Sequence, residues 1–435
     1  MNMIRAKDRD VVVQALRAGV VPRVGQHLIQ VGREREVEVM LKDIGRIVEG
    51  GAVFRIVIGE YGAGKTFFLN LVRAMAMHQK VVTVHADLNP DRRLQGSGGQ
   101  ARSLFAELMK NASIRAKPDG GALGGVVEKF VASAMSDAKA GGSAAGSVLG
   151  DVIRERLSPL QEMVGGYDFA EVIGTYAKAF EDGNAVLKAD AVRWLRGEFS
   201  TKSEARAALG VRNIIDDDQV YDHLKLFGRF VRLAGFGGLL VCLDELVNLY
   251  KLANRQARDN NYEQILRILN DVLQGTVEGV GFLLGGTPEF LMDSRRGLYS
   301  YPALQSRLAE NEFAVRSGLT DYSGPVLRLT SLTREEFYVL VQKLRHVFAY
   351  GDPAKYLLPD EGIEAFMVHS EKRLGEAYFR TPRKTSKAFL DLLAVLEQHP
   401  GADWQPFLGG VQIETDTGAT AERAVEGDGL ADFKL

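Results

Sequence analysis

The segment Gly59-Glu60-Tyr61-Gly62-Ala63-Gly64-Lys65-Thr66 matches the P-loop pattern G-x-x-x-x-G-K-[ST]. Its glycines allow positive φ angles, so that successive backbone N–H groups can converge on phosphate oxygens. A helix that begins at Lys65 would add the positive end of its dipole. In this pattern the Lys65 amine reaches the β- and γ-phosphates, and the Thr66 hydroxyl is a ligand of Mg²⁺. We therefore predict that ATP and Mg²⁺ bind at this loop.

The context of the loop supports this interpretation over a glycine-rich turn without a ligand. An apolar run that is typical of a buried strand precedes the loop (residues 53–58), and a helical pattern follows it. The residues predicted to contact the nucleotide are Gly59, Glu60, Tyr61, Gly62, Ala63, Gly64, Lys65, Thr66 and Phe67.

A pair of acidic residues, Asp244 and Glu245, ends the apolar run at residues 238–245, GLLVCLDE. A continuous apolar run predicts a strand that is buried on both faces. Two carboxylates at its tip are costly to bury unless they bind something. By itself the pair would be read as an acidic helix N-terminus, but the P-loop favours a catalytic interpretation. We assign Asp244 to Mg²⁺ and Glu245 to polarising the attacking water.

Two more strand-like runs end in polar residues. Residues 81–87 (VVTVHAD) end at Asp87, and residues 279–290 (GVGFLLGGTPEF) contain a strand followed by Thr287. Ligands of open α/β sheets bind at the carboxyl ends of parallel strands. Thr287 is therefore a candidate to hydrogen-bond the γ-phosphate or the attacking water.

These residues must be positioned by strands and helices. The strand-like and helical patterns of the sequence predict an α/β fold, in which helices cover both faces of a parallel P-loop sheet. Residues 96–216 carry little strand signal and predict a large, mostly helical insertion. A Thr333/Glu336 capping box and Pro382 in the first turn of a last helix predict a C-terminal helical lid. The expected parts are an N-terminal helical segment (1–30), the P-loop core (31–95 and 217–327), the insertion (96–216), the lid (328–408) and a disordered polar tail (409–435). Within the first part, residues 8–18 predict a short amphipathic helix that starts at an Asp8 cap.

The composition narrows the class of protein. The net charge is −2, so attraction to DNA or anionic lipid must be local. Cys242 is the only cysteine, which excludes a disulfide within the chain and fits a reducing cytoplasm. No signal peptide or run of 18 apolar residues is present, so no membrane association is expected. The seven histidines lack the spacing of metal ligands.

Taken together, the motifs resemble those of the AAA+ ATPases, within them the origin-recognition-like branch. The matching pieces, in the expected order, are Gly32-Arg33-Glu34, the P-loop, Leu243-Asp244-Glu245, Thr287, Ser306-Arg307-Leu308 and Thr381-Pro382-Arg383. The resemblance implies an AAA+ core in which Arg307 is an arginine finger that completes a neighbour's site. It also implies that Arg383 is the sensor-2 arginine at the γ-phosphate of its own site. Thr287 stands where these proteins usually have asparagine, and the long insertion is not part of their general core.

The whole chain is more closely similar to the BrxD-like family, the ATP-binding D component of BREX phage-defence systems. The segments that carry this similarity are VHADLNPDRRLQGSGGQA, WLRGE with EARAALGV, LDELVNLYK and LLGGTPEF. The resemblance implies a bacterial cytoplasmic ATPase that works on foreign DNA with other defence proteins, such as a helicase. The trans arginine implies a homo-oligomer.

Several alternatives stay open from the residues alone. The chain could be a nucleotide-gated switch that scarcely hydrolyses ATP, or a phosphotransferase that uses the same P-loop. Arg307 and Arg383 could be ordinary solvated surface residues. Residues 203–209 could be mistaken for a helix-turn-helix element, but no partner helix rich in base-reading residues accompanies them. The local basic candidates for direct DNA contact are Arg92, Arg93, Arg295, Arg296, Lys384 and Lys387.

Overall fold

The computed structural model describes residues 3–140, 145–374 and 382–410. The tail that was expected to be disordered (409–435) lies almost entirely outside the described residues. The chain divides into two compact units. We call residues 21–60 and 64–330 the sheet unit, and residues 1–20, 61–63 and 331–435 the terminal unit.

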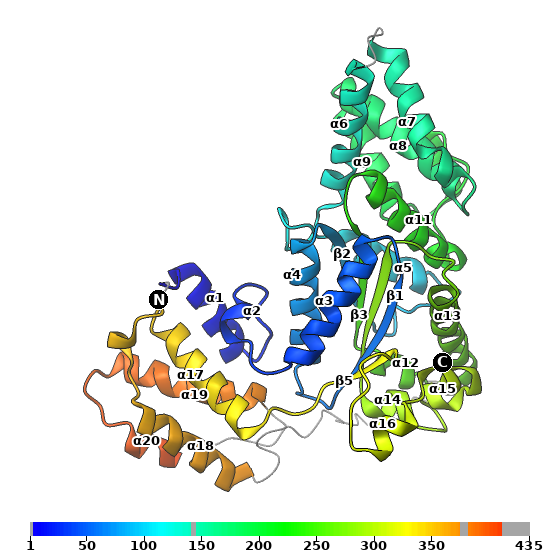
Figure 1. Cartoon of the computed structure of the whole chain (residues 1–435). Helices are drawn as coiled ribbons and strands as arrows, with labels where there is room; N and C mark the ends of the chain where they lie inside the picture. The colour runs from blue at the N-terminus through cyan, green and yellow to red at the C-terminus, as the bar shows by residue number, and fades with distance from the viewer. Residues whose placement is uncertain (1–2, 141–144, 375–381, 411–435) are drawn as a thin grey trace, which may run out of the picture. The chain divides into compact units, whose positions relative to one another are not determined.

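A five-stranded parallel sheet forms the centre of the sheet unit (Figure 1), with the strand order β2-β3-β4-β1-β5. The strands are β1 (Val53–Ile58), β2 (Val81–Asp87), β3 (Gly238–Asp244), β4 (Val280–Gly286) and β5 (Val326–Arg328). Every residue of β1, β3 and β4 is buried, as the continuous apolar runs predict. The predicted parallel α/β sheet is therefore confirmed.

Helices cover both faces of this sheet because successive strand residues point to opposite sides. Val53 and Val57 pack with α3 (Glu34–Val48) and α4 (Lys65–His78) in one apolar cluster. Phe54, Ile56 and Ile58 join a second cluster on the other face. The helices of that second face are α5 (Gln100–Lys110), α11 (Val220–Leu233) and α13 (Arg255–Leu273).

The long connection between β2 and β3 contains helices and, in its described residues, no strand. After α5 come α6 (Leu123–Ala140), α7 (Ala145–Gln161), α8 (Gly166–Glu181), α9 (Ala185–Leu195) and α10 (Lys202–Leu209). Phe130, Tyr176 and Trp194 are completely or almost completely buried, and they belong to the same apolar cluster as the second face of the sheet. The insertion therefore extends the core of the sheet unit rather than forming a separate core.

The terminal unit is helical in its described residues. It contains α1 (Ala6–Arg17), α17 (Arg334–Phe348), α18 (Asp360–Leu374), α19 (Pro382–Gln398) and α20 (Gln405–Gly410). The Thr333/Glu336 capping box is confirmed at the start of α17, and α19 begins at Pro382 as predicted. Helix α1 packs against α17 and α19.

The predicted start of the first helix was wrong. We expected an Asp8 cap, but α1 begins at Ala6 with Arg5 as its N-cap residue and without a side-chain cap. Asp8 instead accepts a hydrogen bond from Arg5 Nε at 2.8 Å, so its carboxylate lies within the first turn. None of the helices in the described part of the chain combines the length and the apolar character needed to cross a bilayer.

Candidate nucleotide-binding site

The P-loop connects the carboxyl end of β1 to the first residue of α4. Gly62 and Gly64 both have φ angles of 82°, and Gly64 is the N-cap residue of the helix. The Lys65 ammonium donates to the carbonyl oxygens of Gly59 at 2.8 Å and Glu60 at 3.0 Å. The backbone carbonyl groups of the loop therefore surround the Lys65 ammonium group, and the 14-residue helix α4 begins at Lys65.

The P-loop helix and strand β3 meet through a direct hydrogen bond. Thr66 Oγ1 donates to Asp244 Oδ2 at 2.6 Å, although the two residues are 178 positions apart. Asp244 is only 7% exposed, and its other oxygen accepts from the Glu245 backbone N–H at 2.8 Å. Both Asp244 oxygens are therefore held, one by the helix and one by the backbone that follows the strand.

Glu245 has an uncommon backbone conformation. Its φ is 59°, in the left-handed region that residues other than glycine rarely adopt. Partial burial raises the pKa of the Glu245 carboxyl, and Asp244 and Asp87 raise it further, while Lys65 opposes them. A raised pKa makes the carboxylate a stronger base, which suits a residue that accepts a proton from water.

Asp87 brings a third carboxyl group to the same edge of the sheet. The register of β2 and β3 places Asp87 opposite Asp244. Burial and the Asp244 charge raise the pKa of Asp87, and Arg92 opposes them. Beyond the strand, Leu88 N–H donates to Asp244 O at 3.0 Å, and Asn248 Nδ2 donates to Leu88 O at 2.7 Å. The connections after β2 and β3 are therefore tied together beside the carboxylates.

Gly285 is a residue of this site that sequence reasoning missed. It lies on β4, which pairs with β3. A Cβ atom at position 285 would lie 2.4 Å from Asp244 Oδ1, far inside contact distance. The absence of a side chain here therefore leaves the space that the Asp244 carboxylate occupies. The only sequence signal was a pair of glycines at the end of a strand whose neighbour was not yet known.

Thr287 follows β4, the strand that lies between β1 and β3. Its hydroxyl oxygen caps the short helix α14 (Pro288–Met292) by accepting from Phe290 N–H at 3.4 Å. The hydroxyl hydrogen is not used in this bond, so Thr287 can still donate to a phosphate or a water. The cap fixes the position of the oxygen.

The structure places the two predicted arginines on helices. Arg307 is exposed on α15 (Pro302–Leu308), where Nε donates to Asn270 Oδ1 at 2.7 Å and Nη1 donates to Ala303 O at 2.8 Å. No carboxylate among the described residues forms an ion pair with Arg307. Arg383 is exposed in the first turn of α19, in the terminal unit, where its guanidinium lies next to Gly19.

The donor set fits Mg²⁺. No group of three or more His, Cys, Asp or Glu residues in the described parts of the chain could hold a metal ion. Mg²⁺ commonly binds through one or two protein oxygens, waters and substrate phosphates. Thr66 Oγ1 and the Asp244 carboxylate already lie within 2.6 Å of each other at the N-terminus of α4 and supply such oxygens.

The chain matches the model of a known protein family. A model of the family described as BREX system ATP-binding protein BrxC/D matches residues 4–412. The match includes the P-loop, β3 with its two carboxylates, the helical insertion and the described helices of the terminal unit. It confirms the resemblance that the sequence segments indicated. No curated protein matches the chain.

Proposed function

The chain belongs to the family of BREX system ATP-binding proteins BrxC/D, and on that premise we propose that it is an AAA+ ATPase that hydrolyses ATP with Mg²⁺ in phage defence. The observation that carries this proposal is the 2.6 Å hydrogen bond between Thr66 and Asp244, with Glu245 directly after it. These are the groups that P-loop hydrolysis requires, and they come from distant parts of the chain.

Binding of ATP replaces hydrogen bonds that the loop now makes within itself. The Lys65 amine exchanges the carbonyl oxygens of Gly59 and Glu60 for β- and γ-phosphate oxygens. Thr66 and Asp244 hold Mg²⁺, which neutralises phosphate charge when it is bound. Glu245 orients the attacking water and accepts its proton, and Thr287 donates a hydrogen bond to the water or the γ-phosphate.

The two arginines complete this proposal. Arg307 is exposed and has no carboxylate partner among the described residues, so it can enter the site of a neighbouring copy in a homo-oligomer. Arg383 acts as the sensor-2 residue at the γ-phosphate of its own chain. An arginine supplied in trans contributes roughly 10³–10⁵ in rate by stabilising transition-state charge. Turnover per subunit should therefore rise with protein concentration until assembly is complete.

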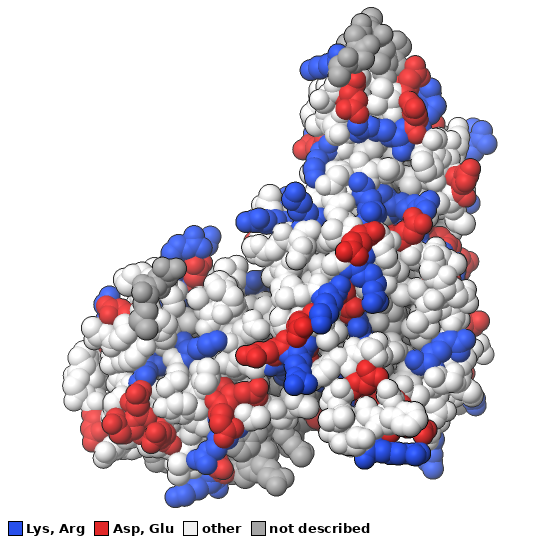
Figure 2. Space-filling model, viewed as in Figure 1, with Lys and Arg blue, Asp and Glu red and all other residues white. Residues whose placement is uncertain are grey.

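We further propose that the nucleotide state controls assembly on DNA, or on a DNA-acting partner such as a helicase, in the bacterial cytoplasm. On the face shown in Figure 2, basic and acidic side chains are interspersed. Some of these charges pair within one helix, as Glu38 and Lys42 of α3 do at 2.8 Å. With a net charge of −2, DNA contact must come from local basic groups. Steep salt dependence of DNA binding would support direct contact, and no detectable binding at low salt would assign the contact to a partner.

The Glu245→Gln variant tests hydrolysis directly. The amide cannot accept the proton, so we expect phosphate release to fall by roughly 10²–10⁴-fold while binding of a fluorescent ATP analogue persists. Glu278→Gln is the matched control, because Glu278 is an exposed residue that pairs with Arg229 and precedes β4, away from the carboxyl ends of the strands. Equally low phosphate release from wild type and Glu245→Gln, with nucleotide binding intact, would favour the nucleotide-gated switch.

A further inference from the structure

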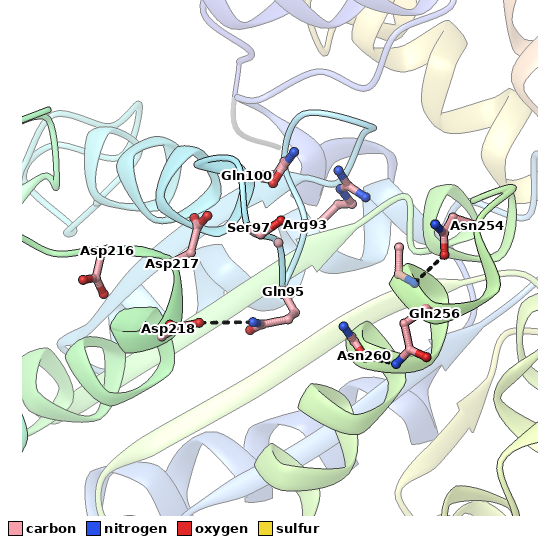
Figure 3. Close-up of a pocket in the computed structure, with 12 residues that line it drawn as sticks. Arg93, Gln95, Ser97, Gln100, Asp216, Asp217, Asp218, Asn254, Gln256 and Asn260 are labelled. Carbon is pink, nitrogen blue, oxygen red and sulfur yellow. Dashed lines mark hydrogen bonds between the residues drawn. The ribbon is translucent and has the colours of Figure 1, made fainter.

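A polar cavity lies on the sheet unit beside the connections that follow β2 and β3 (Figure 3). Its volume is about 560 Å³, within the range of small-molecule and peptide-side-chain sites. The loop after β2, the turn at Asp216–Asp218 and the first turns of α13 form its walls. In Figure 3 the aspartates lie on one side, the amides of α13 on the other, and Gln95 between them.

Hydrogen bonds fix the walls of this cavity. Asn261 is completely buried, and its amide both accepts from Gln95 N–H at 2.9 Å and donates to Gln95 O at 3.1 Å. The Asp217 carboxylate accepts from Gly99 N–H at 2.6 Å and Arg102 N–H at 2.8 Å. The loop and the turn are therefore held in place without a ligand, so the cavity is preformed.

Two of the lining residues keep buried polar atoms without a partner. Arg93 Nε and Asp216 Oδ1 have no hydrogen bond to any described residue. Asp218 holds only a long bond of 3.4 Å from Gln95 Nε2. Buried donors and acceptors are almost always satisfied in folded proteins. Arg93 Nε and Asp216 Oδ1 are themselves enclosed by protein atoms, so a ligand in the cavity would instead meet the other polar atoms of these two side chains, which have no hydrogen bond to a described residue either.

The composition of the walls selects the class of ligand. Three aspartates face a single arginine, which opposes a phosphate backbone. No aromatic side chain lines the cavity, so it offers no surface for stacking a base. The remaining lining groups are mostly amides, which suit the N–H and C=O groups of a peptide.

We propose that this cavity binds an arginine-bearing polypeptide segment of a partner protein. The guanidinium donates to Asp216 and Asp218, because a planar fork of N–H donors matches carboxylate oxygens. A main-chain carbonyl of the segment accepts from a terminal nitrogen of the Arg93 guanidinium. The side-chain amides of Asn254 and Asn260 bind the main chain on either side.

The cavity and the nucleotide site share the connections that follow β2 and β3. The loop that forms one wall leaves β2 directly after Asp87, and the α13 wall follows Glu245 along the chain. The Asn248–Leu88 hydrogen bond, at 2.7 Å, joins the two connections at their base. The proposal itself concerns only binding and does not depend on ATP hydrolysis.

N-acetyl-arginine amide carries both the guanidinium and the peptide groups and is the probe. Saturation-transfer NMR on the full chain should detect its binding at millimolar concentration. We expect Asp216→Asn and Arg93→Gln each to weaken binding about tenfold, because each removes one charged hydrogen bond. Asp119→Asn, which removes an exposed charge outside the cavity, should leave binding unchanged.

Three outcomes would overturn the proposal. They are no saturation transfer to the probe, equal binding by wild type and both cavity variants, or binding of a fifteen-nucleotide oligo-dT that depends on Arg93 while the probe does not bind. The last outcome would assign the cavity to nucleic acid. Should Asp216→Asn lower the melting temperature strongly, Asp218→Asn takes its place, because Asp218 is an exposed lining residue that the guanidinium also contacts.

Discussion

The nucleotide site and the polar cavity meet in the connection that follows β3, yet they are built from different kinds of group. Main-chain N–H groups, one lysine and a helix N-terminus form the P-loop, all within eight consecutive residues. Side chains from three separated segments form the cavity. A phosphate site can therefore be encoded locally, whereas a side-chain cavity depends on tertiary packing. The two regions should respond differently to substitution.

The largest expected effect is on turnover, from Arg307→Ala. If Arg307 enters a neighbour's site, ATP hydrolysis should fall by roughly 10³-fold or more. The exposed side chain should change the free energy of unfolding by less than about 1 kcal/mol. Phosphate release across a protein concentration series, together with thermal melting, measures both. N-acetyl-arginine amide should still bind, because the cavity uses none of these groups.

Arg316→Ala provides the matched control. Arg316 is an exposed arginine on the nearby helix α16 (Glu312–Arg316), and its only ion pair with a described residue is the one with Glu312, at 3.1 Å. Its loss should leave turnover unchanged. A similar fall of turnover in both variants would mean that this surface tolerates no substitution. That result would contradict a specific role for Arg307.

The next largest effect is expected from Gly285→Ala. This variant tests whether the nucleotide site depends on close packing around Asp244 as well as on the residues of the P-loop motif. The new Cβ would lie 2.4 Å from Asp244 Oδ1, so the carboxylate must move away from Thr66 or from Glu245 N–H. Mutation of a residue that orients a metal ligand commonly lowers metal affinity or activity by about 10–100-fold. We expect a rise of that size in the Mg²⁺ concentration needed for half-maximal turnover.

Gly174→Ala is the control for adding a methyl group. Gly174 lies on α8, and a Cβ there would meet nothing within 4 Å. This variant should keep the Mg²⁺ requirement of wild type, and it should gain about 0.4–1 kcal/mol of stability from reduced unfolded-state entropy. A Gly285→Ala protein with the wild-type Mg²⁺ requirement would contradict the positioning role.

These residues also mark the boundary of what the sequence could predict. The four long strands, the P-loop and the acidic pair follow from local patterns, and the Thr66–Asp244 contact follows from the known geometry of P-loop proteins. Gly285 could not be identified because its role depends on which strand pairs with β3. The start of α1 was misjudged because Asp8 bonds to Arg5 and does not cap the helix.

The cavity was beyond sequence reasoning for the same physical reason. Arg93 was predicted only as a local basic residue, and no role was predicted for the turn at Asp216–Asp218. Nothing in their spacing brings them together, because the whole helical insertion separates them in the chain. Asn261, which holds the loop in place, has no local pattern at all.

A smaller effect on turnover is expected from Asn261→Ala, which perturbs only the cavity. It removes both bonds to the Gln95 backbone and leaves buried polar groups unsatisfied. We expect a loss of about 1–3 kcal/mol in the free energy of unfolding, weaker binding of N-acetyl-arginine amide and nearly unchanged ATP turnover. Asn260→Ala, which removes an exposed amide bonded to Gln256, should cost little stability. A Mg²⁺ requirement raised as far as in Gly285→Ala would show that the two regions are not separable.

The smallest effect is on the pH dependence of stability, and it arises from the different charges of the two regions. The cavity is lined by aspartates, whereas β2, which ends at the nucleotide site, contains His85 close to the positive charges of Arg73 and Arg23. Burial, and then the Arg73 and Arg23 charges, lower the pKa of His85 to about 3. Neutral His85 is therefore favoured in the folded state, and the unfolded state binds the extra proton below an ordinary pKa of about 6.5.

The sign of the effect follows from this difference in proton binding. The contribution of His85 is complete above pH of about 6.5 and is lost progressively as the pH falls toward 3, because protonation favours the unfolded chain. Between pH 7 and 5.5 wild type should lose about 1 kcal/mol more than His85→Asn. Urea unfolding at both pH values measures this difference. Buried His223, whose pKa is also lowered, contributes equally to both proteins and cancels. Parallel losses in the two proteins would mean that burial and the nearby arginines do not keep His85 neutral in the folded state.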